Sequence, residues 1–298
     1  MIIQKSNQLL PLSTMANKAA AYFKLLKFRL SIVVAFSSAI GFILGRPDYT
    51  VLEVVLVLLG ALLVTGSANI INQVIEREHD KHMKRTAKRP LPTGQITVTE
   101  AIVYCILLGV TGLVILAVAF NWLAAGLSLL SLLLYGFVYT PLKRISPICV
   151  FVGAIPGGLP PLIGWAAATG FLGVEAWILF GIQFIWQFPH FWAIAWVSDE
   201  DYKRAGFKML PFEGGKNLKT AIQIMIYTLL LIPLSLLPLQ FGMTGVTSAM
   251  IAVVCGVLFL AQTFYLMSTC SKKAAMNIMF GSFLYLPIVQ IAFVLDKI

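Results

Sequence analysis

Three polar side chains in the stretch 69–94 have the types and the spacing for metal chemistry. Asn72, Glu76 and Asp80 follow one another at intervals of four residues, at the end of a long apolar run. On a helix this spacing places them down one side, each about 40° round from the last, over roughly 12 Å. Mg²⁺ usually takes one or two carboxylates and fills its other positions with water and phosphate oxygens. This ladder of side chains therefore suits a magnesium site.

A basic run follows the ladder, before Pro90 and Pro92 end any helix. Its members can hold phosphate charge next to the metal: Lys81, Lys84, Arg85, Lys88 and Arg89. The combination predicts a metal–diphosphate site at a membrane surface. The alternative is a set of ordinary interfacial residues on a helix that has left the bilayer. For one residue that alternative is equally good, but ionisable groups near membrane depth are costly, so the whole set favours function.

A second acidic stretch repeats the pattern later in the chain. Asp199, Glu200 and Asp201 precede a basic group made of Lys203, Arg204 and Lys208. Four apolar stretches separate the two acidic sequences, so both must open on the same side of a membrane. Carboxylates facing each other there could hold two Mg²⁺ ions on one diphosphate. A solvated loop is the competing interpretation of the second stretch.

Other candidate residues carry weaker signals. Tyr135 and Tyr139 lie one helical turn apart, as in an interfacial aromatic belt. Lys143 and Arg144 follow them and suit simple membrane anchors as well as they suit a site. His190, in the run QFIWQFPHFW, would more often be a satisfied polar residue inside a bundle than a catalyst.

The composition sets the kind of protein that positions these residues. Of 298 residues, 59% are hydrophobic and only 11% are charged, which is too apolar for a soluble chain of this length. Apolar stretches of about 20 residues predict an all-α polytopic membrane protein, whereas a membrane barrel would show short alternating segments. We expect nine transmembrane helices in one bundle, around an apolar chamber open to the cytoplasmic side, at 23–45, 51–75, 98–118, 121–140, 147–169, 173–197, 218–239, 244–268 and 274–294.

The charge distribution fixes the expected orientation. With the N-terminus in the cytoplasm, every Lys and Arg except Arg46 and Lys297 falls on the cytoplasmic side. This asymmetry is the positive-inside rule, so the net charge of +10 reflects topology and does not require a nucleic-acid partner. Residues 1–22 have no signal-peptide pattern and are expected to be a cytoplasmic lead-in without defined structure. The whole chain, 1–298, is expected to form a single domain in a cell inner membrane.

The four cysteines and the fifth apolar stretch complete the survey. No CxxC pair is present, so Cys105, Cys149, Cys255 and Cys270 are expected to pack and not to bind zinc. The stretch 147–169 is rich in glycine and proline, which disfavours an undisturbed helix. We expect a kinked helix that lines a cavity, with close helix packing as the competing explanation.

Several motifs resemble the UbiA-type intramembrane prenyltransferases over nearly the whole chain. Asn72, Glu76 and Asp80 match the first acidic motif of that family, NxxxDxxxD, with Glu in place of the usual first Asp. The second motif, usually DxxxD, is compressed here to Asp199–Asp201. Further runs resemble the haem-alkylating members of the family: Met83–Gly94, YTPLKR at 139–144, GGLPPLIGWAAATG at 157–170, WQFPHFW at 186–192 and DYKRAGFKMLP at 201–211.

The resemblance implies transfer of farnesyl from farnesyl diphosphate to a vinyl group of haem b, giving haem O and diphosphate. It implies Mg²⁺ as the cofactor, held by Asn72, Glu76, Asp80 and the acids Asp199 and Asp201, with Asp201 preferred. Arg85, Arg89, Lys143 and Lys203 would neutralise the departing diphosphate. His190 would contact the haem as an axial ligand or propionate partner, and His79 and His82 are weaker candidates. The bilayer surrounds the protein, and a haem A synthase or terminal oxidase assembly is a possible partner.

Three other functions remain open at this point. A related prenyltransferase with an aromatic, quinone-precursor acceptor would share the first motif. A transporter for an anion would use the broken fifth span. A transporter would carry its site near the membrane midplane, whereas both acidic stretches of this chain are expected at one face, which disfavours this function. A haem-binding structural subunit would show no Mg²⁺ dependence.

Overall fold

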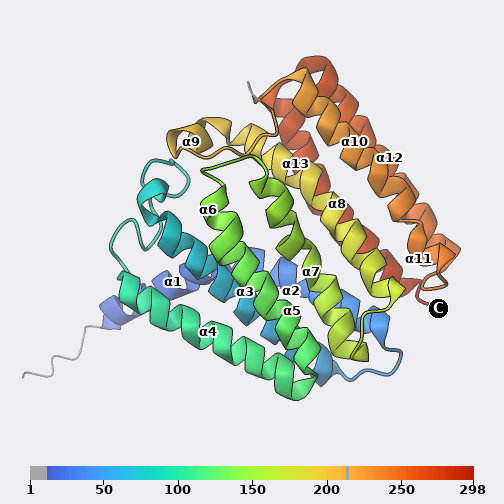
Figure 1. Ribbon diagram of the computed structural model, residues 1–298, viewed down its shortest axis with the longest axis horizontal. Coiled ribbons are helices and arrows are strands. Elements are labelled where there is room, and N and C mark those ends of the chain that lie inside the picture. The colour runs from blue at the N-terminus through green and yellow to red at the C-terminus, as the bar shows by residue number, and fades with distance from the viewer. Residues whose placement is uncertain (1–11, 213–214) are drawn as a thin grey trace, which may run out of the picture.

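The computed structural model describes the backbone of residues 12–212 and 215–298, and the side chains from residue 17 onward within those ranges. Within these ranges the chain has nine helical segments long and apolar enough to cross a membrane, as expected. The protein is therefore a multi-pass, all-helical membrane protein (Figure 1). Its elements are α1 Leu12–Leu26, α2 Phe28–Gly45, α3 Val51–Asp80, α4 Val98–Ala119, α5 Trp122–Leu133, the π-helix η1 Leu134–Tyr139, α6 Thr140–Leu142, α7 Cys149–Thr169, α8 Val174–Val197, α9 Asp199–Arg204, α10 Leu218–Leu234, α11 Leu237–Gln240, α12 Val246–Thr269 and α13 Lys272–Leu295.

The N-terminal lead-in differs from the expectation. Residues 12–26 form the helix α1 and are not without structure, while residues 1–11 lie outside the described range. The expected first span, 23–45, is divided at Lys27, which has φ 49° and ψ 50°. A left-handed residue interrupts the helical path, so α2 begins a new direction at Phe28. Cytoplasmic placement of this segment stays a prediction.

Local sequence signals explain where the long helices begin. Thr50 and Glu53 form a capping box at the start of α3, and Thr97 and Glu100 form another at the start of α4. Each box satisfies two backbone N–H groups that the first helical turn leaves free. The first box starts a helix of 30 residues that reaches Asp80, and α3 therefore carries the whole acidic ladder.

The helices pack as two groups that meet at α2, α7, α8 and α13. Helices α3, α4 and α5 lie on one side with α2 and α7, whereas α10 and α12 lie on the other with α8 and α13 (Figure 1). A buried hydrogen bond from Ser37 Oγ to Gln290 Oε1, 3.1 Å, joins α2 to α13. Lys297 donates to the carbonyls of Ile43 and Arg46, which ties the C-terminus to the end of α2.

Helix α7 covers the glycine- and proline-rich stretch for which we expect a kink, and that kink stays a prediction. It runs without interruption from Cys149 to Thr169 despite three internal prolines, and most of it is buried. A Cβ on Gly164 would lie 1.8 Å from the carbonyl oxygen of Ser38, so α2 and α7 touch through their backbones. The small residues of α7 therefore allow the close helix packing that we gave as the competing explanation.

Side chains from neighbouring helices satisfy two of the carbonyls that these prolines leave free. Pro161 cannot bond the carbonyl of Gly157, which instead accepts from Gln183 Nε2 at 2.8 Å and Gln187 Nε2 at 3.1 Å. Pro160 likewise frees the carbonyl of Pro156, which accepts from Ser131 Oγ. Internal proline is tolerated in a membrane helix when its neighbours supply donors in this way.

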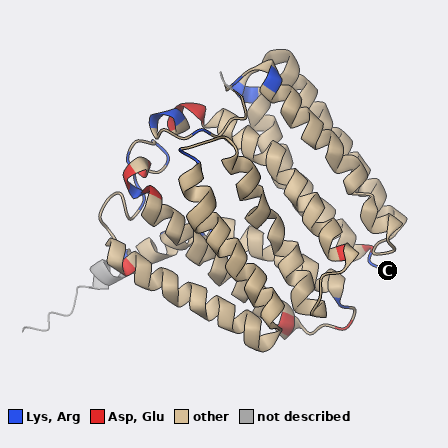
Figure 2. Cartoon of the chain, viewed as in Figure 1, with Lys and Arg blue, Asp and Glu red and all other residues tan. Residues whose placement is uncertain are grey.

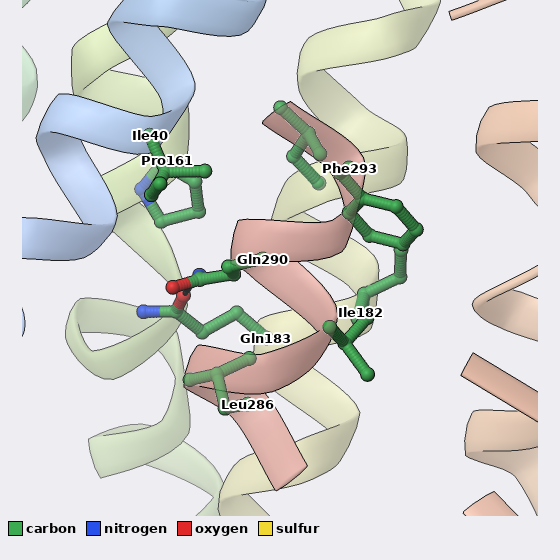
Figure 3. Close-up of a pocket in the computed structure, with 9 residues that line it drawn as sticks. Ile40, Pro161, Ile182, Gln183, Leu286, Gln290 and Phe293 are labelled. Carbon is green, nitrogen blue, oxygen red and sulfur yellow. Dashed lines mark hydrogen bonds between the residues drawn. The ribbon is translucent and has the colours of Figure 1, made fainter. Parts of the chain in front are cut away.

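A small cavity lies beside α7 in the middle of the bundle. Pro161, Ile182, Gln183, Leu286 and Gln290 help to line it (Figure 3). Its volume of about 10 Å³ has room for one water at most, so it is not the predicted substrate chamber. The chamber and its cytoplasmic opening stay predictions.

Candidate active site

The acidic ladder is buried at the last turns of α3. Asn72, Glu76 and Asp80 are 2%, 4% and 0% exposed. Because the helix continues to Asp80, all three side chains descend one face, as their spacing predicts. Carboxylates at this depth require charged or hydrogen-bonding partners, since an unpaired buried charge is strongly destabilising.

Each member of the ladder has a basic partner from a different part of the chain. Lys27 Nζ lies 3.3 Å from Asn72 Oδ1. Lys143 Nζ lies 2.8 Å from Glu76 Oε1, and Arg89 Nη1 lies 2.7 Å from Asp80 Oδ2. The structure thus brings together Lys143 and Arg89, both predicted from sequence, and adds Lys27.

Glu76 and Lys143 form a buried ion pair. Burial alone would lower the pKa of Lys143, but the Glu76 carboxylate and the nearby Tyr139 and Tyr135 outweigh it, so the pKa of Lys143 is raised. The Lys143 ammonium also lies 4.5 Å from the centre of the Tyr139 ring. The π-helix η1 lies one short helix before this lysine, with α6 between them, and such a π-helix shifts the phase of the side chains that follow it.

Asp80 has one carboxylate oxygen free for a ligand. Its Oδ2 is bound by Arg89, whereas Oδ1 is buried and has no hydrogen-bond partner in the part of the chain that the structure describes. The Thr86 hydroxyl donates to the Asp80 carbonyl at 2.8 Å and fixes the loop that returns Arg89 to the helix end. A buried orphan oxygen is unfavourable unless a cation or donor occupies it, so Asp80 fits a metal ligand.

Lys27 is a site residue that the sequence analysis missed. The positive-inside pattern treated it as an ordinary cytoplasmic charge. Its position at the break between α1 and α2 instead directs Nζ to Asn72. Burial, then the nearby Arg89 and Lys143, hold the pKa of Lys27 well below its usual value. The one signal in the sequence was a lysine at the very start of an apolar span.

Thr140 supports the ladder from the other side. Asn72 Nδ2 donates to Thr140 Oγ1 at 3.2 Å, and Thr140 donates in turn to the Tyr135 carbonyl. The Asn72 amide is therefore held at both ends, by Lys27 on its oxygen and Thr140 on its nitrogen. This contact also links α3 to α6, the element that precedes Lys143.

The second acidic stretch forms the short helix α9. Asp199 lies 2.9 Å from Lys203 Nζ and 3.5 Å from Lys216 Nζ, and Asp201 pairs with Arg204. Among the described residues, no three His, Cys, Asp or Glu side chains gather closely enough to hold a metal. The two acidic stretches therefore do not form one preassembled set, and the ligand roles of Asp199 and Asp201 stay predictions.

The segment after α9 packs against the ladder region. The Phe207 ring lies 5.9 Å from His79 and 5.8 Å from Lys143 Nζ, and the Lys208 amide donates to the Lys143 carbonyl at 2.7 Å. Figure 2 shows that acidic and basic residues of α9 and of the loop after α3 gather along one edge of the molecule. Both acidic stretches thus lie at the same end of the bundle, as the span count requires.

Three predicted residues are not brought to this cluster. Arg85 and His82 are exposed on the loop after α3. His190 lies on α8 and contacts α13: its Nδ1 is 2.9 Å from Ser282 Oγ, and its ring stacks on Trp186 at 4.4 Å between centroids. The next residue, Phe191, contacts Tyr139 at 6.3 Å, which connects this part of α8 to the ladder region.

Comparisons with known proteins place this geometry in a family. The sequence model of the UbiA prenyltransferase family matches residues 33–286. A protoheme IX farnesyltransferase from Cytophaga hutchinsonii is 61% identical over 287 residues, covering 95% of this chain and all of that protein.

Solved structures share the fold. A digeranylgeranylglyceryl phosphate synthase aligns with TM-score 0.77 and 23% identity, covering 94% of this chain and 98% of that one. A UbiA homologue from Archaeoglobus fulgidus, bound to GPP and Mg²⁺, aligns with TM-score 0.65 and 20% identity, covering 92% and 99%. With its nine spans and a family match over most of its length, this chain belongs to the UbiA prenyltransferase family.

Proposed function

We propose that this protein is a haem-alkylating prenyltransferase. It transfers farnesyl from farnesyl diphosphate to a vinyl group of haem b and releases haem O and diphosphate. The observation that carries the diphosphate half is the buried ladder with three cations around it, Lys27, Lys143 and Arg89. Support for the haem half comes from the 61% identical relative named protoheme IX farnesyltransferase.

The cations bind the diphosphate and stabilise its departure. Lys143 and Arg89 are already held in place by Glu76 and Asp80, so they need little reorganisation when the leaving group gains charge. Lys27 is the third donor; burial and the nearby Arg89 and Lys143 lower its pKa, and an anion bound beside it would favour its charged form. Arg85 and Lys203 lie more exposed and are proposed as outer contacts of the same diphosphate.

Mg²⁺ is the proposed cofactor. Its holders are Glu76 and Asp80, with the amide oxygen of Asn72 and the acids Asp199 and Asp201 completing the set once diphosphate is bound. The buried free oxygen of Asp80 supports this assignment. When bound, Mg²⁺ supplies positive charge to the diphosphate oxygens. The Archaeoglobus fulgidus homologue bound to GPP and Mg²⁺ is consistent with this choice.

In the proposed reaction, farnesyl diphosphate, haem b and water give haem O, diphosphate and a proton. The bond from C1 of farnesyl to the diphosphate oxygen breaks, and its electron pair leaves with diphosphate. The vinyl group of haem b supplies the electrons for the new carbon–carbon bond to C1. Water adds to the resulting cationic carbon and loses a proton, which gives the hydroxyethylfarnesyl group. Tyr135, Tyr139 and Phe191 form an aromatic wall next to the ladder that limits early entry of water.

The setting of the reaction is also part of the proposal. The protein lies in a cell inner membrane with its N-terminus and active site facing the cytoplasm, and 1–298 acts as one domain. The gathering of basic residues at one end of the molecule supports this orientation (Figure 2). A haem A synthase or terminal oxidase assembly is the proposed consumer of haem O.

Release of inorganic diphosphate tests the acceptor. Purified protein with farnesyl diphosphate and Mg²⁺ is supplied either with haem b or with an aromatic acid such as 4-hydroxybenzoate. We expect release to accelerate with haem b alone. Acceleration by the aromatic acid alone would instead indicate a quinone-precursor prenyltransferase, and no release from folded protein would favour transport of an anion.

A further inference from the structure

The surroundings of His190 determine which of its ring nitrogens carries the proton. Nδ1 lies 2.9 Å from the hydroxyl oxygen of Ser282, which is fully buried on α13. The same hydroxyl donates its hydrogen to the Met279 carbonyl at 2.6 Å. A serine hydroxyl has one hydrogen, so Ser282 must accept from the histidine. The neutral ring is therefore protonated at Nδ1, and Nε2 carries a lone pair.

Trp186 fixes the plane of the same ring. The indole stacks on His190 with 4.4 Å between centroids and 19° between planes. Its Nε1 donates to the carbonyl of Ser282 at 3.0 Å, so the stacking partner is anchored to the residue that holds Nδ1. Both restraints on the imidazole therefore depend on Ser282, and they leave Nε2 without a hydrogen bond to any described residue.

The surroundings of His190 leave this part of α8 partly exposed at the surface of the bundle. His190 is itself only partly buried, and Phe283, which packs edge-on against it at 5.2 Å, is 45% exposed. One turn and two turns deeper on α8, Gln187 and Gln183 are occupied by the Gly157 carbonyl, and Gln183 also bonds Gln290 (Figure 3). These two glutamine amides are used in hydrogen bonds between helices, whereas Nε2 of His190 makes no hydrogen bond to a described residue.

We propose that His190 binds the iron of the haem substrate through Nε2, and that Ser282 is the positioning residue that sets its tautomer. A metal requires the lone pair of a neutral imidazole, and a hydrogen-bond acceptor on the other ring nitrogen is the usual way to orient the ring. A propionate requires an N–H donor, which at Nε2 would exist only in an imidazolium ion, and such a charge is costly in an apolar span. The proposal rests on haem b as substrate and narrows how it is held.

Removing the iron separates the two roles of His190. Full-length wild type and His190→Ala are titrated with haem b and with metal-free protoporphyrin IX, which keeps both propionates. We expect His190→Ala to weaken haem b binding and shift its Soret band, and to leave binding of the metal-free porphyrin unchanged. Added imidazole should restore the haem spectrum of the variant. Equal weakening for both porphyrins would overturn iron ligation in favour of a propionate contact.

Ser282→Ala tests the positioning role. It should weaken haem b binding by about tenfold without changing metal-free porphyrin binding. Tenfold is the lower end of the loss in metal affinity when a metal-binding histidine loses its hydrogen-bond partner. The matched control is Ser128→Ala, which removes another buried hydroxyl that donates within its own helix, to Ala124. An unchanged haem affinity and spectrum in Ser282→Ala would overturn the positioning role.

The outcome is distinguishable from a failure of the proposed function. Farnesylation of haem is followed separately by mass in the wild-type protein. If wild type alkylates haem b and His190→Ala binds it with an unaltered spectrum, the function stands and the iron ligand is wrong. If His190 ligates haem b but no farnesylated haem forms, the ligand stands and the function is wrong.

Discussion

Asp80 is a buried carboxylate of which only one oxygen has a partner among the described residues. Its side chain is fully buried, one oxygen is bound to Arg89, and the other is without a partner among the described residues. We predict that Asp80→Asn lowers kcat for diphosphate release by about 100- to 1000-fold, because it removes negative charge where we propose that the metal binds. The measurement is diphosphate release at saturating Mg²⁺. Glu78→Gln is the matched control, since Glu78 is an exposed acid on the same helix; an equal loss in both variants would contradict a metal role for Asp80.

Lys27 provides a second test at this scale. We predict that Lys27→Met weakens binding of farnesyl diphosphate by about tenfold, the loss of one charge-assisted contact, while Lys27→Arg retains most of the affinity. Binding is measured calorimetrically with a non-hydrolysable farnesyl diphosphate analogue. Lys24→Met, three residues away and exposed, is the control. Full affinity in Lys27→Met would exclude this lysine from the diphosphate site.

Glu76 and Lys143 should behave as a unit. Removing one partner leaves a buried charge without compensation, which costs about 3–5 kcal/mol in such pairs. We predict that Lys143→Met destabilises the protein more than the double variant Glu76→Gln, Lys143→Met does. Thermal unfolding in detergent measures the difference. Additive effects of the two substitutions would contradict a coupled pair.

At the scale of elements, α7 packs backbone to backbone against α2. Gly164 touches the backbone of α2, and a Cβ there would meet the Ser38 carbonyl at 1.8 Å. We predict that Gly164→Ala destabilises the protein by about 1–3 kcal/mol, as overpacking does, and lowers the unfolding temperature in detergent. Gly181→Ala on α8 is the control, since a Cβ there has nothing within 4 Å. Equal stability of the two variants would contradict the close packing of α2 and α7.

The same elements show what could be predicted from sequence. Long apolar runs and the four-residue spacing of Asn72, Glu76 and Asp80 are local patterns, and all nine spans and the buried ladder are confirmed. The continuity of α7 could not be predicted, because it depends on donors such as Gln183 from another helix. The role of Lys27 depends on a single left-handed residue, and composition does not reveal such a break. Contacts between distant parts of the chain, and not local helix propensity, determine the continuity of α7 and the position of Lys27.

At the scale of the whole molecule, charged residues gather at the two ends of the bundle, and most of the basic residues lie at one of them (Figure 2). The basic residues of the loop after α3, of α9 and of the start of α13 lie at one end. The loop between α2 and α3 and the start of α3, which carry Arg46, Asp48 and Glu53, lie at the other end (Figures 1 and 2). We predict that, with the native cysteines replaced, Lys273→Cys in intact cells is protected from a membrane-impermeant maleimide, while Asp48→Cys is labelled. The opposite labelling would reverse the orientation and place the diphosphate site outside.

The most direct test of the account is the mass of haem after reaction. Purified protein is incubated with haem b, farnesyl diphosphate and Mg²⁺, and the extracted haem is analysed by mass spectrometry. We predict a product heavier by one farnesyl group and one hydroxyl group, formed by wild type and absent with Asp80→Asn. Unchanged haem beside released diphosphate, from folded wild-type protein, would contradict haem as the acceptor.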